Sequence, residues 1–244
     1  MMLQELKTAI LPLMRRNAAG MIIVISSLWS FLPLMAQISA TIALRGTITE
    51  ETTGKPAGSN ITIFDMSGKK ITSTRSNPVT GEYYILLKPG MKFSLVFEGD
   101  NIFKETVSAD IPALKKYAEI TRDWLVHANS PGTKLKPLGS PFEYKKAKLR
   151  VGVDEILAQF NDILKSNPSV KFYIRCYPDV ASSEQVATAF TAERARNLRE
   201  YFIAHGVDAA QVEVKASGTV DPANPIPEGK AAKGRRYVGS TYLV

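Results

Sequence analysis

Asp179-Val-Ala-Ser-Ser-Glu-Gln-Val-Ala-Thr-Ala-Phe-Thr-Ala-Glu-Arg194 is the stretch that decides the fold of the second half of the chain. Residues 171–176, just before it, alternate and are rich in β-forming residues, which predicts a strand. Ser182-x-x-Gln185 has the spacing of a capping box, and Gly206 is a typical helix terminator. We therefore expect a strand, a loop that carries Asp179, and a helix that carries Arg194.

Arg194 falls on the apolar face of this expected helix. At 100° per residue, five large side chains gather around it on one face: Val186, Phe190, Leu198, Tyr201 and Phe202. A guanidinium on a packing face needs a partner, and Asp179 is placed to share whatever Arg194 binds. Two interpretations stay open: the two residues form a structural ion pair, or they hold a ligand together.

Further motifs flank this stretch in a fixed order. They are Phe142-Glu-Tyr-Lys-Lys-Ala-Lys-Leu149, an amphipathic helix, Ser166-Asn-Pro168, Cys176-Tyr-Pro-Asp179, Phe190-Thr-Ala-Glu-Arg-Ala195 and Gly234-Arg-Arg236. With them, residues 138–244 resemble the OmpA-like peptidoglycan-binding domain. That family has a short strand before the first helix, Gly-His-Thr-Asp after the second strand, Leu-Ser-x-x-Arg-Ala in the second helix and Asn-Arg-Arg at the last strand. Asp179 and Arg194 take the family's Asp and Arg positions without a gap.

The resemblance implies that Asp179 and Arg194 grip the diaminopimelate of the peptidoglycan stem peptide. The free amino-acid end of this ligand is a zwitterion, so a carboxylate can accept hydrogen bonds from its ammonium while a guanidinium binds its carboxylate. Arg235 and Arg236 match the family's Arg-Arg pair and are further candidates for binding stem-peptide carboxylates. Alternating side chains point to opposite faces of a strand, so both cannot reach one pocket, and solvation of the strand is the other interpretation.

Several positions depart from the family pattern. Cys176-Tyr-Pro178 replaces the family's Gly-His-Thr, and Phe190-Thr191 replaces its Leu-Ser. Ala187 stands where the family usually has an Asn before Leu-Ser, and Gly234 replaces the Asn of Asn-Arg-Arg. Hydrogen bonds from neighbouring residues orient the groups that touch a ligand. The alternative function is therefore an envelope scaffold whose OmpA-like domain has lost peptidoglycan binding.

The rest of residues 138–244 predicts an α/β sandwich of the order βαβαββ with a mixed sheet. The first helix has an apolar stripe formed by Val153, Ile156, Leu157, Phe160 and Leu164, and we expect it to end at Asn167-Pro168. Residues 211–216 and 235–243 predict the remaining strands. Helices that alternate with strands are typical of helices packed on a sheet.

The preceding part of the chain predicts an antiparallel β-sandwich. The expected strands are residues 42–49, 60–65, 70–75, 82–87, 92–98 and 102–107, each separated from the next by Gly, Pro or Asn turn signals. Gly46-x-Ile48, Thr53-Gly-Lys-Pro56, Gly81-Glu-Tyr-Tyr84 and Leu87-Lys-Pro-Gly90 make residues 42–110 resemble the carboxypeptidase regulatory-like (transthyretin-like) domain. The resemblance implies a non-catalytic module that contacts another envelope protein or glycan, or one that serves as a spacer. Residues 111–137 are expected to be a connector, of which 119–126 could form a final strand.

Residues 1–36 predict a signal peptide. Arg15-Arg16 precedes an uncharged apolar run over residues 21–36, with cleavage expected near Ala36-Gln37 or at Ala40. A retained anchor is the alternative, since the uncharged span continues to Leu44. No Cys follows the run, so a lipoprotein anchor is excluded. We expect an exported protein of a Gram-negative bacterium, in the periplasm or on the periplasmic side of the outer membrane.

Composition narrows the function classes. The 244 residues are 45% hydrophobic, enough for two domain cores, and the net charge of +8 comes without any nucleic-acid-binding motif. Cys176 is the only cysteine, so no internal disulfide forms, and we expect a buried, inert thiol. His127 and His205 have no nucleophile or base pattern around them. We therefore expect no catalytic residue, metal site or cofactor, and the family resemblance, confined to the soluble domain, does not imply a membrane pore.

Overall fold

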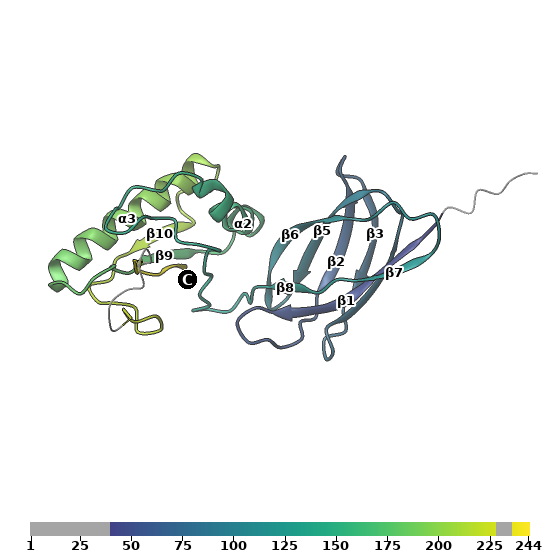
Figure 1. Ribbon diagram of the computed structural model, residues 1–244, viewed down its shortest axis with the longest axis horizontal. Coiled ribbons are helices and arrows are strands. Elements are labelled where there is room, and N and C mark those ends of the chain that lie inside the picture. Colours follow the sequence, from purple (N-terminus) through teal and green to yellow (C-terminus); the bar gives the residue numbers. More distant parts are fainter. Residues whose placement is uncertain (1–39, 228–235) are drawn as a thin grey trace, which may run out of the picture. The chain divides into compact units, whose positions relative to one another are not determined.

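The computed structural model of the protein describes residues 40–227 and 236–244 (Figure 1). The predicted signal peptide, residues 1–36, lies outside these ranges, and so does Arg235. Among the described residues, no helix combines the length and the apolar character that crossing a membrane requires.

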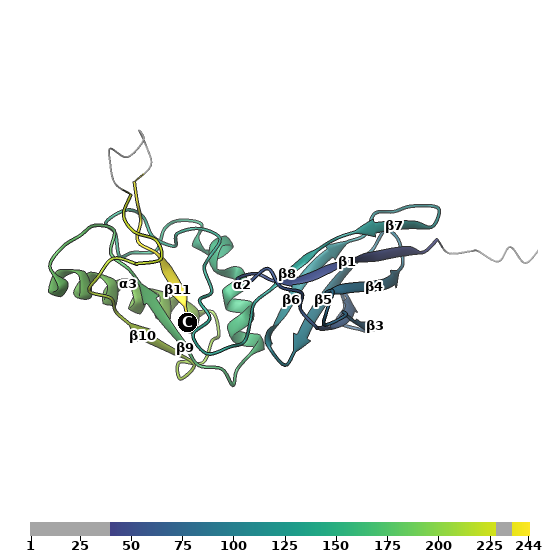
Figure 2. The same cartoon turned by 90° about the horizontal axis from the view of Figure 1, so that it is seen from below.

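A β-sandwich forms the first part of the described chain, as predicted. Its strands are β1 (Ile42–Glu50), β2 (Asn60–Asp65), β3 (Lys70–Arg75), β4 (Glu82–Leu87), β5 (Lys92–Gly99), β6 (Ile102–Asp110), β7 (Ala118–Thr121) and β8 (Trp124–Val126). One sheet has the order β3-β2-β5-β6 and is antiparallel throughout. The other has the order β4-β1-β7, and β8 also pairs with β1 (Figure 2).

Alternation of side chains explains how the two sheets enclose a core. In β4, Tyr83, Ile85 and Leu87 are buried, whereas Tyr84 and Leu86 are exposed. Successive side chains of a strand point to opposite faces, so one set packs between the sheets and the other faces solvent. The buried set of this domain includes Ile42, Leu44, Ile48, Ile61, Ile63, Phe93, Leu95, Phe97, Ile111 and Val126.

The strands β7 and β8 lie within residues 111–137, the segment predicted as a connector. Both run parallel to β1, with Leu44 opposite Ile120 and Thr49 opposite Leu125. The possibility of a final strand over residues 119–126 is thus realised as two short strands. The sandwich therefore extends beyond residue 110.

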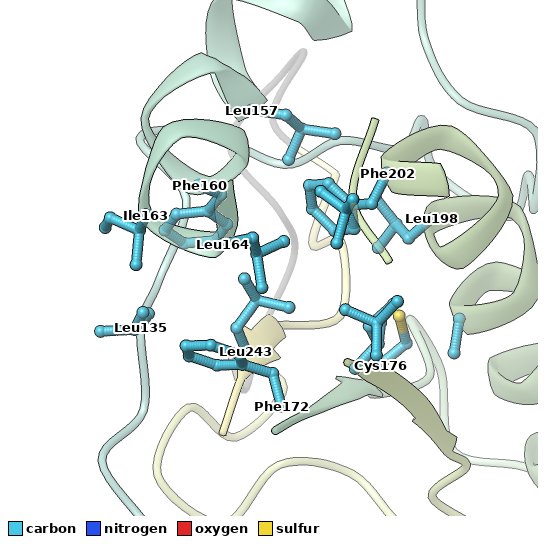
Figure 3. Packing of buried hydrophobic residues seen from close by; sticks show 14 of the residues in the cluster. Leu135, Leu157, Phe160, Ile163, Leu164, Phe172, Cys176, Leu198, Phe202 and Leu243 are labelled. Carbon is cyan, nitrogen blue, oxygen red and sulfur yellow. The ribbon is translucent and has the colours of Figure 1, made fainter. Parts of the chain in front are cut away.

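An α/β domain follows, with helices α2 (Val153–Ser166) and α3 (Glu184–Ala204) and strands β9 (Phe172–Cys176), β10 (Val212–Lys215) and β11 (Thr241–Leu243). The central strand β9 is parallel to β10 and antiparallel to β11, which confirms the predicted mixed sheet. Figure 2 shows the three strands beside α3. In Figure 3, Phe160 and Leu164 of α2 and Leu198 and Phe202 of α3 face side chains of the strands.

The short strand expected before the first helix is absent from the described residues. Residues 142–149 form a loop instead, closed by a single bridge between Phe142 and Leu149. The reason is visible in its hydrogen bonds, because backbone groups of this loop bind side chains of the loop after β9 and of α3 rather than a neighbouring strand.

The start of α3 also differs from the prediction. Ser183 is the N-cap residue and no side chain caps the helix, whereas the Ser182 hydroxyl donates to the carbonyl of Ser183, so the capping box was wrong. The buried stripe is shifted as well. Ala187 is buried while Val186 is 61% exposed. The reason is that residue 187, and not residue 186, lies on the same face of the helix as the buried residues Thr191, Arg194 and Leu198. The helix ends before Gly206, whose φ of 89° confirms its role as terminator.

Candidate functional site

Asp179 and Arg194 form a bidentate ion pair in the α/β domain. Arg194 Nη1 lies 2.6 Å from Asp179 Oδ1, and Arg194 Nη2 lies 2.8 Å from Asp179 Oδ2. The strand β9 ends three residues before Asp179, and Arg194 lies in the middle of α3, so the sequence spacing places them together as expected. Arg194 is 0% exposed and Asp179 is 2% exposed.

Backbone groups complete the hydrogen bonding of this pair. Arg194 donates from Nε to the carbonyl of Lys146 at 3.0 Å and from Nη2 to the carbonyl of Glu143 at 3.0 Å. Asp179 accepts from the amide of Lys145, and from the amide of Gly239 at 2.7 Å. Residues 143–146, which we name the covering loop, therefore bind the cation and the anion at once.

The covering loop has one unusual backbone conformation. Lys145 has a φ of 55°, and it is the only residue other than glycine with a positive φ in the described chain. The left-handed region is disfavoured for a residue with a Cβ atom. This conformation directs the Lys145 amide to the Asp179 carboxylate, so the loop keeps a strained residue where it contacts the pair.

Two aromatic rings enclose the guanidinium. The Arg194 Cζ atom lies 4.8 Å from the ring centroid of Phe142 and 4.4 Å from that of Phe190. Both distances are typical of cation–π contacts. Phe190 is one of the departures from the family pattern, and it thus supplies a stacking surface for the Arg.

A second departure, Thr191, ties α3 to the segment after β10. The Thr191 hydroxyl donates to the carbonyl of Ser217 at 2.9 Å and accepts from its amide at 3.0 Å. Gly218, next along the chain, allows close contact with the helix, because a Cβ atom there would lie 2.5 Å from Cγ of Glu184. Phe190 and Thr191, which depart from the family pattern, therefore have packing and hydrogen-bonding partners of their own.

Cys176 lies in the core beneath this site and is unsuited to chemistry. Burial raises the pKa of its thiol to about 12, although a hydrogen bond from Thr241 and the charge of Arg194 act in the opposite direction. The nucleophilic form of cysteine is the thiolate. The prediction of a buried, inert thiol agrees with this geometry.

The structure places one of the two terminal Arg candidates. Arg236 is exposed, and its guanidinium carbon lies 5.3 Å from the ring centroid of Tyr144, a residue of the covering loop. Within the described part of the chain, the structure shows no hydrogen bond between Arg236 and either Asp179 or Arg194. Arg236 thus contacts the outside of the loop that covers the pair.

Two polar clusters were not predicted from the sequence. In the α/β domain, buried Asp221 accepts a hydrogen bond from the Tyr242 hydroxyl at 2.7 Å. Burial raises the pKa of Asp221, but the hydrogen bonds of Tyr242 and Ala223 outweigh it and the pKa is lowered. These residues come from segments far apart in the chain, so no local pattern indicates their contact.

The other cluster lies in the β-sandwich and surrounds His127. Its Nδ1 atom lies 2.9 Å from Glu105 Oε1 and its Nε2 atom lies 2.7 Å from Glu51 Oε2. Burial alone would lower the pKa of His127, but the hydrogen bond and charge of Glu105, with those of Glu51, raise it above 6.5. An imidazolium donates from both nitrogens, so the protonated ring satisfies both carboxylates.

Within residues 40–227 and 236–244, no group of three or more His, Cys, Asp and Glu residues is arranged to hold a metal ion. The site described here consists of a matched anion and cation with backbone donors and acceptors. In such a set the carboxylate can accept hydrogen bonds from a cationic group, and the guanidinium can donate hydrogen bonds to an anionic group.

Comparison with known proteins identifies the second domain. Residues 141–236 match the OmpA family model, so the chain carries an OmpA family domain. The chain is also 36% identical over 84 residues to the "Peptidoglycan-binding protein ArfA" of Mycobacterium tuberculosis (strain ATCC 25618 / H37Rv) and, with the same values, to that of Mycobacterium bovis. This match covers 34% of the chain and 26% of the relative, so the chain spans about a quarter of the length of these curated relatives.

Solved structures give more distant likenesses. The peptidoglycan-associated lipoprotein from Burkholderia pseudomallei is 21% identical with a TM-score of 0.35, over 48% of this chain and 96% of that one. The OmpA-like domain of FopA1 from Francisella tularensis is 14% identical with a TM-score of 0.31, over 46% and 79% of the two chains.

Proposed function

We propose that this protein is a non-enzymatic component of the cell envelope that binds peptidoglycan through its OmpA family domain. In this proposal Asp179 and Arg194 receive the free zwitterionic end of the diaminopimelate in the stem peptide. The observation that carries it is the bidentate pairing of these two residues within the matched segment. The similarity to proteins described as peptidoglycan-binding supports it.

The backbone partners of the pair support the same ligand class. Two carbonyl oxygens, from Glu143 and Lys146, occupy donors of Arg194, and two amides, from Lys145 and Gly239, occupy acceptors of Asp179. A zwitterionic amino-acid end offers the same complement, with carboxylate oxygens for the Arg and an ammonium for the Asp. Backbone of the chain itself thus takes the positions that the ligand would take.

Binding in this proposal requires the covering loop to move, because both charged side chains are buried. The strained φ of Lys145 lowers the stability of the closed loop relative to an open one. The observed affinity then equals the intrinsic affinity reduced by the open fraction. A weak single site is sufficient on a polymer, since sacculi present many stem peptides at high effective concentration.

A second candidate function is an envelope scaffold in which the pair is purely structural. The specific observation in its favour is that Arg194 and Asp179 are enclosed and hydrogen-bonded by their own chain. Buried ion pairs with satisfied partners commonly fix a conformation without binding anything. The two functions differ in whether the loop opens to admit a stem peptide.

The experiment is co-sedimentation of the full-length protein with purified sacculi, using two variants of one loop residue. Lys145→Pro removes the amide donor to Asp179 and cannot adopt a φ of 55°, so it favours the open loop. Lys145→Gly keeps the donor and adopts positive φ without strain, so it favours the closed loop. The lost hydrogen bond to a charged group is worth about 1.5–3 kcal/mol, which corresponds to about tenfold or more in the open fraction.

We expect sacculus binding to rise in Lys145→Pro, to fall in Lys145→Gly and to be lost in Asp179→Asn. Circular dichroism spectra establish that each variant remains folded. Equal sedimentation of all four proteins contradicts a ligand role for the pair and favours the scaffold function.

We also propose that the chain is exported, that it resides in the periplasm or on the periplasmic side of an outer membrane, and that its β-sandwich contacts another envelope component. The expected mature protein begins near Gln37. Intact-mass measurement of protein from its native host tests the export. A chain that retains residues 21–36 and needs detergent for extraction would establish the anchored alternative.

A further inference from the structure

The outer face of the sheet β4-β1-β7 carries an unusual set of exposed side chains. The strand register places Tyr84 of β4 opposite Arg45 of β1, and Leu86 of β4 opposite Ala43 of β1, which in turn lies opposite Glu119 of β7. Tyr84 and Leu86 are each about half exposed. These residues point away from the core, whose side of β4 holds Tyr83 and Ile85.

The side chain of Tyr117 reaches this face. Tyr117 directly precedes β7, and its hydroxyl donates to Glu119 Oε1 at 2.9 Å. Hydrogen bonding with Tyr84, and then with Glu119, raises the pKa of Tyr117. Ala43, between Leu86 and Glu119 in the register, is 0% exposed, so its outward side is covered. The other side of the Tyr117 ring faces solvent, since the residue is 57% exposed.

Basic residues flank the members of this surface in the sequence. Arg45 Nη1 pairs with Glu119 Oε2 at 3.1 Å, and Lys88, Lys115 and Lys116 are exposed at the ends of the neighbouring segments. Glu119 is thus already paired. Glu82 of β4, which shares the outward side of Tyr84 and Leu86, is a second exposed carboxylate, so the three lysines still leave an excess of positive charge. A ligand with negative charge complements this rim.

We propose that this surface, formed by Tyr84, Leu86, Tyr117, Arg45 and Glu119, binds a strand of an acidic polysaccharide whose sugars carry carboxylates. The C–H groups on the apolar face of a pyranose are weakly positive and stack on the negative face of an aromatic ring. The phenol hydroxyls and the Arg45–Glu119 pair supply donors and acceptors for sugar hydroxyls, and the lysines bind the carboxylates. This site is independent of the stem-peptide site proposed above, because it lies in the other domain.

The composition of the surface favours a polysaccharide over a protein partner. Protein interfaces are depleted in Lys and centre on a larger apolar core, whereas Leu86 is the one exposed aliphatic side chain of this set. The Tyr117 side chain is held by its hydrogen bond to Glu119, and Tyr84 stands on a strand, so little side-chain entropy is lost on binding. An exposed sheet face also admits an extended polymer that continues beyond it at both ends.

The test is binding of the full-length protein to polygalacturonate, measured by isothermal titration calorimetry. Neutral dextran and dextran sulfate are the comparison polymers. We expect polygalacturonate to bind, and Tyr117→Ala to weaken it about tenfold while Tyr117→Phe weakens it less. Tyr173→Ala is the matched control, because Tyr173 is a 44% exposed Tyr on β9 of the other domain, and it should leave the affinity unchanged.

Three results would overturn the proposal. The first is the absence of any heat of binding with polygalacturonate at low salt. The second is that Tyr117→Ala and Tyr173→Ala bind polygalacturonate with equal affinity. The third is that the protein binds neutral dextran as tightly as polygalacturonate. Dextran sulfate bound as tightly, and with no dependence on Tyr117, would assign the interaction to charge alone and overturn it too. Thermal melting of each variant shows that the sandwich is intact.

Discussion

Replacement of Arg194 by Met should strongly destabilise the α/β domain. The variant keeps a long apolar side chain but leaves the Asp179 carboxylate buried with only the amides of Lys145 and Gly239 as partners. It also removes the N–H groups of Arg194 that donate hydrogen bonds to the carbonyl oxygens of Glu143 and Lys146. Breaking a buried pair from one side costs about 3–5 kcal/mol. Since domains are stable by about 5–15 kcal/mol, this loss is large.

Urea unfolding can follow the two domains separately. Both described helices, α2 and α3, belong to the α/β domain, so circular dichroism at the helical minimum reports on it, while fluorescence of Trp124 in β8 reports on the sandwich. We expect Arg194→Met to shift the helical transition and to leave the Trp124 transition in place. The coupling with Asp179→Ala in a double-mutant cycle should be on the order of 2–3 kcal/mol.

Arg196→Ala is the matched control, because Arg196 is exposed on the same helix. A loss below about 1 kcal/mol in Arg194→Met, similar to that of Arg196→Ala, would refute the reasoning. It would mean that the buried pair contributes little to the folded state.

Three further predictions concern other parts of the molecule. The folded-state pKa of His127 is raised above 6.5, so the contribution of His127 to stability is full below that pH and is lost as pH rises through the folded pKa. Urea unfolding of the sandwich, measured as a function of pH, should show this loss of stability. The variant His127→Gln should not show it. Cys176 should resist a thiol reagent in the native state and react on unfolding, so fast native labelling would contradict its burial. Gly239→Ala should lower the free energy of unfolding by about 1–3 kcal/mol in thermal or urea melts, since its Cβ would lie 2.0 Å from the carbonyl oxygen of Tyr177, and an unchanged stability would contradict this packing.

Much of the fold follows from local sequence patterns. The bounds of β2, β3 and β4 agree with the predicted strands, because apolar alternation and turn residues act over a few positions. Helix α2 and its buried stripe also agree, apart from Ile156, which is only partly buried. The N-cap of α3 is Ser183 rather than the predicted Ser182, a shift of one residue, since two adjacent serines offer the same local signal.

The candidate site was predictable in its charged pair and not in its surroundings. The spacing of Asp179 and Arg194 indicates that they meet, because a short loop connects their strand and helix. Nothing local shows that residues 143–146 supply the backbone groups that enclose them, since that contact joins segments more than 30 residues apart. The same limit applies to His127, which follows β8 and whose partner Glu105 lies in β6, 22 residues earlier.

The most direct test of the proposed function is the dependence of sacculus binding on the stem peptide. Full-length protein carrying Tyr117→Ala, which removes the proposed polysaccharide contact, is sedimented with intact sacculi and with sacculi whose stem peptides have been removed by an amidase. We predict binding to intact sacculi, its loss after amidase treatment, and its competition by free diaminopimelate. Equal sedimentation with both preparations, unaffected by diaminopimelate, would contradict recognition of the stem peptide by Asp179 and Arg194.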